Sequence, residues 1–79
     1  MEYSVYPNPA TDILNVKSAT GKAANIEILD VTGKQVKYAT VGAGSSTVEI
    51  ADFVPGVYLY QIKTLDQQVV RTGKLLVNP

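Results

Sequence analysis

A proline–glycine turn followed by an alternating apolar run constrains this chain more than any other feature of its sequence. Pro55 and Gly56 suit the centre of a type II turn, because proline presets φ and glycine takes the positive φ required next. Large apolar residues then recur at every second position: Tyr58, Tyr60 and Ile62. A period of two with aromatic and β-branched residues indicates a strand. We therefore predict a central strand here, with this set in the core.

The rest of the chain divides into similar short runs separated by turn residues. Strands are predicted at residues 3–6, 13–17, 24–29, 34–40, 47–50, 57–63 and 69–77. Loops are predicted at 18–23 and 41–46. The side chains expected in the core are Ile26, Ile28, Val36, Val48, Phe53, Tyr58 and Tyr60. Seven short strands without helical periodicity predict an all-β fold, an antiparallel β-sandwich in one domain.

Two further glycines mark expected backbone features. Asp30 suits the first position of a type I turn and Gly33 the fourth, where a left-handed residue forms a bulge. The strand that returns from this hairpin is expected to point Val36 and Tyr38 inward. Gly73 interrupts the last run and predicts a bulge or bend there, because glycine weakens a regular strand.

The charge balance and the missing residue types exclude several function classes. Seven basic and seven acidic residues cancel, which argues against a nucleic-acid partner and against a polybasic membrane-surface module. The chain has no cysteine and no histidine, so it lacks thiolates, the commonest general base and the commonest zinc ligand. No apolar run approaches the roughly eighteen residues of a membrane-spanning helix. We expect no enzyme activity, no cofactor and no direct membrane insertion.

The carboxylates and tyrosines each admit a functional and a structural interpretation. Asp12, Asp30, Asp52 and Asp66 all fall at predicted turns. They lack the spacing of a calcium loop, so turn chemistry is favoured over a metal site. The five tyrosines could form a sugar-stacking platform, but core packing is favoured because Tyr58 and Tyr60 share a face with Ile62.

The beginning of the chain shows no signal peptide before Tyr3. Taken alone, this predicts a cytosolic protein. It equally fits a domain from the end of a longer exported chain.

Four segments, taken together and in order, resemble a known family. They are residues 5–12 (VYPNPATD), 26–36 (IEILDVTGKQV), 55–58 (PGVY) and 73–77 (GKLLV). This series is similar to the C-terminal sorting domains of the type IX secretion system of Bacteroidetes. The residues that carry the resemblance, and are expected to serve recognition, are Pro7, Asn8, Pro9, Gly56, Tyr58, Gly73, Lys74, Leu75, Leu76 and Val77.

The resemblance implies an Ig-like sandwich over residues 1–79 that follows a secreted passenger domain. Such a domain is exported to the periplasm and read by the translocon at the outer membrane. A sortase-like peptidase then removes it, and in many members the passenger is attached to anionic lipopolysaccharide at the cell surface. The final strand is expected to offer backbone groups for strand addition to a receptor, with Arg71 and Lys74 protecting its edge from aggregation.

Two alternatives remain from the residues alone. One is a fibronectin-like or adhesin-type binding module of a secreted protein, and the other is a spacer. A sugar-binding module should display a row of exposed aromatic side chains. Fold analogy does not separate these classes.

Overall fold

The computed structural model describes residues 3–7, 10–18 and 21–78 of the chain, and these contain seven strands and no helix. The strands are β1 (Tyr3–Tyr6), β2 (Ile13–Ser18), β3 (Ala24–Leu29), β4 (Gln35–Val41), β5 (Ser45–Glu49), β6 (Gly56–Thr64) and β7 (Val69–Val77). The predicted strands are confirmed with small shifts. The predicted 41–46 loop is too long, because β4 runs to Val41 and β5 begins at Ser45.

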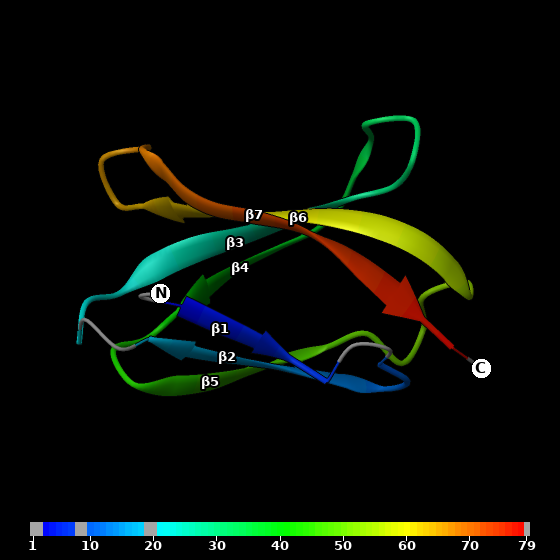
Figure 1. Ribbon diagram of the computed structural model, residues 1–79, viewed down its shortest axis with the longest axis horizontal. Helices are drawn as coiled ribbons and strands as arrows, with labels where there is room; N and C mark the ends of the chain where they lie inside the picture. The colour runs from blue at the N-terminus through cyan, green and yellow to red at the C-terminus, as the bar shows by residue number, and fades with distance from the viewer. Residues whose placement is uncertain (1–2, 8–9, 19–20, 79) are drawn as a thin grey trace.

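The strands form two antiparallel sheets that pack face to face, as Figure 1 shows. One sheet has the order β1-β2-β5 and the other β4-β3-β6-β7. The predicted antiparallel sandwich is therefore confirmed. The predicted central strand is also confirmed, since β6 lies between β3 and β7, pairing Tyr60 with Ile28 and Tyr58 with Leu75.

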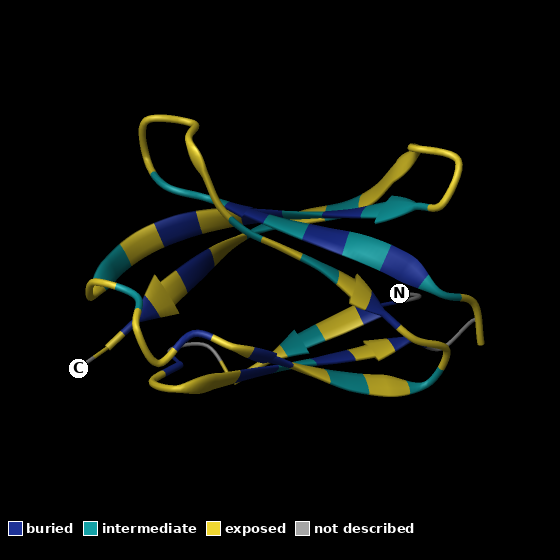
Figure 2. Cartoon of the chain, turned by 180° about the vertical axis from the view of Figure 1, so that it is seen from behind, coloured by how far each residue is buried: buried dark blue, intermediate teal, exposed yellow. Residues whose placement is uncertain are grey.

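Buried and more exposed residues alternate along strands of both sheets (Figure 2), and the buried side chains form one hydrophobic core. The largest fully buried side chains are Leu14, Val16, Ile26, Ile28, Val41, Ile50, Ile62 and Leu75. Of the expected core residues, Ile26, Ile28, Val48, Tyr58 and Tyr60 are buried. Phe53 is partly buried and packs against the core.

The orientation predicted for the returning strand β4 is wrong. Val36 and Tyr38 are 39% and 47% exposed, whereas Val41 is buried. The cause is a register shift between Ile28 and Leu29, an irregularity typical of a β-bulge. One extra residue on β4 moves the following side chains to the opposite faces, so that Ala39 rather than Tyr38 lies opposite Ile26.

The two predicted turn glycines have positive φ. Gly33 has φ of 89° and its N–H donates to the carbonyl of Asp30 at 3.0 Å, which confirms the hairpin. Gly56 has φ of 151°, so the positive sign is confirmed. This angle differs from the roughly 80° of a type II turn, because Gly56 already pairs with Val77 as the first residue of β6.

Candidate functional site at the C-terminal end of the sandwich

The four segments that carry the resemblance meet at one end of the sandwich. Gly56 at the start of β6 pairs with Val77 at the end of β7, and Ala10 forms a parallel bridge to Val77. The 30–33 turn follows Leu29, which pairs with Leu59 near the start of β6. In Figure 1 this is the end from which the C-terminus emerges, whereas β1 begins at the other end.

Ala10 closes the outer edge of β7 at its last residues. Its N–H donates to the Leu76 carbonyl at 2.9 Å, and the Asn78 N–H donates to the Ala10 carbonyl at 2.8 Å. Ala10 is only 1% exposed. Pro7, three residues before it, is exposed, while Asn8 and Pro9 lie outside the described residues. Tyr6 thus ends a strand of one sheet, and Ala10 lies at the edge of the other.

Gly56 and Tyr58 have structural roles at this end. The Tyr58 hydroxyl donates to the Val54 carbonyl at 2.5 Å, and the Tyr58 ring lies 5.1 Å from the ring of Phe53. A tyrosine near the start of this strand that bonds back to the preceding backbone is the tyrosine corner of Ig-like domains. Tyr58 therefore anchors the 51–55 loop and is buried at 8% exposure.

The bulge predicted at Gly73 is absent from that position. Gly73 pairs regularly with Tyr60, and the register shift of β7 falls instead between the pairs formed by Ile62 and Lys63. The reason for glycine is the Tyr60 ring, because a Cβ atom on Gly73 would lie 2.5 Å from its hydroxyl oxygen and 2.6 Å from Cζ. This close cross-strand approach requires a residue without a side chain.

The ending of β7 divides into inward and outward residues. Leu75 and Val77 are buried in the core. Lys74 and Leu76 point to the outer face of the four-stranded sheet, where Leu76 lies opposite Val57 and Lys74 opposite Leu59. Among the predicted recognition residues with described structure, Pro7, Lys74 and Leu76 therefore offer exposed side chains to a partner.

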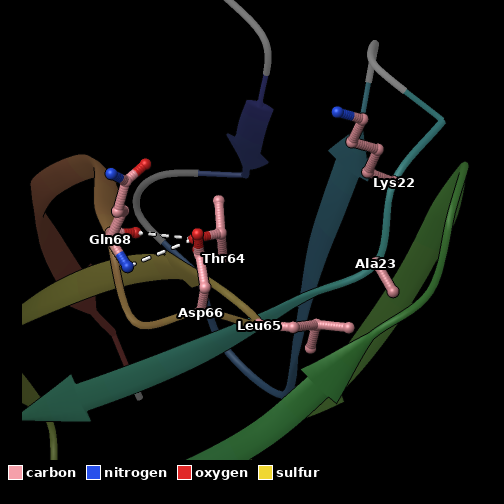
Figure 3. A pocket seen from close by; sticks show the side chains of 6 residues that line it. All are labelled: Lys22, Ala23, Thr64, Leu65, Asp66 and Gln68. Atoms are coloured by element: carbon pink, nitrogen blue, oxygen red, sulfur yellow. Dashed lines mark hydrogen bonds between the residues drawn. The ribbon is translucent and has the colours of Figure 1, made fainter.

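A hollow in the described surface lies at the opposite end of the molecule (Figure 3). It has a volume of about 560 Å³ and is lined by Lys22, Ala23, Thr64, Leu65, Asp66 and Gln68. The polar groups of its 64–68 side bond within the turn: the Thr64 hydroxyl donates to Asp66 and accepts from the Gln68 N–H at 3.2 Å. The hollow therefore lies between the β6–β7 hairpin turn and residues 22–23.

The carboxylates of Asp30 and Asp66 accept hydrogen bonds within their turns, as the sequence predicts. Asp30 accepts from the Thr32 hydroxyl at 2.5 Å and from the N–H groups of Thr32 and Lys34 at 2.9 and 3.0 Å. The Thr32 hydroxyl, followed by the Lys34 N–H, holds the pKa of Asp30 below its ordinary value of 3.8. Among the described residues, no three potential metal ligands come together.

The tyrosines form no stacking row on the part of the surface that the structure describes. Tyr3, Tyr58 and Tyr60 are buried, and the exposed Tyr6 and Tyr38 belong to different sheets. The core interpretation of Tyr58 and Tyr60 is confirmed. No helix within the described ranges is long and apolar enough to cross a membrane.

Comparison with known proteins gives one positive result. The family model described as secretion system C-terminal sorting domain matches residues 4–78, nearly the whole chain. No curated protein matches the chain significantly.

Proposed function

Because the chain belongs to the family of secretion system C-terminal sorting domains, we propose that residues 1–79 form one non-catalytic domain that addresses a preceding passenger to the type IX secretion machinery. The observation that carries this proposal is the family match over residues 4–78 on an Ig-like sandwich. A sorting signal of this family belongs to a secreted protein that moves to the outer membrane or the cell surface.

The later steps of export are part of the proposal. The translocon reads the domain at the outer membrane, a sortase-like peptidase removes it, and the passenger is attached at the cell surface. The positions of the two ends suit a passenger that precedes β1. A passenger preceding β1 would join the sandwich at the end opposite the one where the four family-like segments meet.

The candidate recognition residues divide by role in this proposal. Gly56, Tyr58, Gly73, Leu75 and Val77 hold the shape of the C-terminal end. Lys74 and Leu76 contact the machinery through their outward side chains, and Pro7, Asn8 and Pro9 complete the recognised set.

A reporter fusion tests the proposal. The 79-residue chain is placed behind a periplasm-delivered reporter in a type IX-competent cell, and reporter at the surface or in the medium is measured. We expect delivery that requires both the chain and an intact translocon. The controls are the reporter alone and a translocon-deficient strain. Retention of the fusion in the periplasm of the competent cell would contradict the proposal and favour a binding module.

A further inference from the structure

Four apolar side chains form a continuous patch on the outer face of the four-stranded sheet. This outer patch consists of Leu29, Val57, Leu59 and Leu76. Leu29 pairs with Leu59, and Val57 pairs with Leu76, so the patch spans the three neighbouring strands β3, β6 and β7. Val57, Leu59 and Leu76 are 40%, 43% and 38% exposed.

The outer patch is bordered by hairpin turns and by polar residues. It lies toward the C-terminal end, next to the 30–33 turn. Figure 1 shows the 31–34 and 65–68 turns rising from the two ends of this sheet, away from the other sheet. Beyond Leu59 the same face carries Glu27 and Lys63, joined by an ion pair of 3.5 Å, and the half-exposed Tyr38, which pairs with Glu27. An apolar area bounded by polar residues is typical of an interaction site.

The adjacent edge of β7 is poorly suited to bind a partner by strand addition. Its last residues already bond to Ala10, through the Leu76 carbonyl and the Asn78 N–H. Its first residues are interrupted by the register shift between the partners of Ile62 and Lys63. Arg71 shares the inward face with Ile62 and its Nε atom is buried. A bulge and an inward-pointing charge are two devices that protect sheet edges from pairing.

Because the start of this edge is irregular and its end is already bonded, recognition through side chains is favoured near this end. Resting on the proposed function, we propose that the outer patch is the surface by which the type IX machinery reads this domain, through an apolar protein surface that fits between the two hairpin turns. In this proposal the partner contacts the outer face of β3, β6 and β7. It does not add a strand to the end of β7, which is the mode expected from the sequence.

The size of the patch favours a transient partner over a second copy of the chain. Four partly exposed side chains present on the order of 200–300 Å² of apolar surface, well below the ~800 Å² per partner of a stable interface. A sorting signal must be released after it is read, so a small contact suits this role.

Matched substitutions in the reporter fusion test the proposal. Leu59→Gln and Leu76→Gln make the patch polar, and Ile13→Gln makes the same kind of change on the outer face of the other sheet, where Ile13 is also 43% exposed. We expect each patch variant to reduce delivery by roughly tenfold or more, as loss of a central interface contact does, and Ile13→Gln to have little effect. Val57→Thr, which keeps side-chain shape and strand propensity, serves if a glutamine variant loses its thermal transition.

The possible outcomes separate this inference from the proposed function. Delivery of the unmodified fusion together with unchanged delivery of all folded patch variants would overturn the patch and leave the sorting function standing. Equal loss in the Ile13→Gln control would overturn it as well. Retention of the unmodified fusion would defeat both proposals.

Site-specific cross-linking identifies what covers the patch. A photoreactive phenylalanine analogue replaces Leu59 in the fusion, and the same analogue at Ile13 is the control. We expect a cross-link to a translocon component at position 59 alone, absent in a translocon-deficient strain. A cross-link between two copies of the chain, or to lipid only, would overturn the assignment to a machinery protein.

Discussion

Gly73 is required by the aromatic ring that lies across it. Tyr60 is 5% exposed, so its ring has little room to move away from an added methyl group. We expect Gly73→Ala to lower the free energy of unfolding by about 1–3 kcal/mol, as overpacking in a core does. Chemical denaturation measures this. Gly42→Ala is the control, because its Cβ would meet only the Ser46 hydroxyl at 3.8 Å, and we expect a loss under about 0.5 kcal/mol. Equal stability of the two variants would contradict this role of Gly73.

The sequence shows that Gly73 is unusual but does not show why. A glycine inside an apolar run has the same appearance whether it permits a bulge or a close contact. Only the register of β6 against β7, which places Tyr60 opposite Gly73, separates the two. Ala10 is a similar case, since nothing in its local sequence indicates a bridge to Val77.

Asp30 makes the stability of the β3–β4 hairpin depend on pH. Its pKa in the folded chain is lower than the ordinary 3.8, mainly through the Thr32 hydroxyl and the Lys34 N–H. The stabilisation is therefore complete above pH 3.8 and is lost as the pH falls through the folded pKa. We expect stability to fall less steeply below this pH in Asp30→Asn than in the unmodified chain. Urea denaturation over a pH series tests this, and parallel curves for the two proteins would contradict it.

At the scale of elements, the β3–β4 and β6–β7 hairpins close with the same hydrogen bonds. Asp30 N–H donates to Lys34 and Gly33 N–H to Asp30, at 2.9 and 3.0 Å. Thr64 N–H donates to Gln68 and Gln67 N–H to Thr64, at 2.8 and 2.9 Å. Gln67 thus occupies the position of Gly33, with φ of 74°, a left-handed conformation that disfavours residues with a side chain.

Exchanging these two residues should have opposite effects on stability. A left-handed conformation costs a residue with a side chain about 1–2 kcal/mol. Glycine avoids this cost, but it loses more conformational entropy on folding than other residues, so the net gain from glycine is smaller. We expect Gln67→Gly to stabilise the chain by about 0.5–1 kcal/mol and Gly33→Gln to destabilise it by a similar amount. Thermal or chemical unfolding measures both. A destabilising Gln67→Gly would show that the Gln67 side chain contributes more than its backbone strain.

Strand positions could be predicted from the sequence, but one strand orientation could not. Alternation in β6 correctly placed Tyr58, Tyr60 and Ile62 in the core, because its pairing with β3 has no register shift and its pairing with β7 is regular from Gly56 to Ile62. In β4 the alternation of Val36 and Tyr38 suggested the same, yet the register shift at the hairpin reversed it. A one-residue shift in the register of β4 depends on its pairing with β3, and the sequence pattern of β4 alone does not reveal that pairing.

At the scale of the whole molecule, the candidate site could be predicted only as separate segments. The sequence identifies residues 5–12, 26–36, 55–58 and 73–77 but not their meeting at one end. Their assembly depends on long-range pairs such as Gly56 with Val77 and Ala10 with Val77. The outward residues Val57 and Leu59 join the site for the same reason, through their pairing with Leu76 and Leu29.

The separation of the two ends gives a prediction about additions to the chain. β1 begins at one end of a molecule 32 Å long, and β7 finishes at the other, where Asn78 bonds to Ala10. A small folded domain joined after residue 79 by a short linker would remain close to the 30–33 turn and the end of β7. The same domain joined before residue 3 would lie at the far end, on the side where a passenger is expected.

We expect the C-terminal addition to abolish surface delivery of the reporter and the N-terminal addition to preserve it. Thermal unfolding of both fusions provides the control, since the sandwich should melt at the same temperature in each. Undiminished delivery of the C-terminal fusion would mean that the machinery reads this domain from another side.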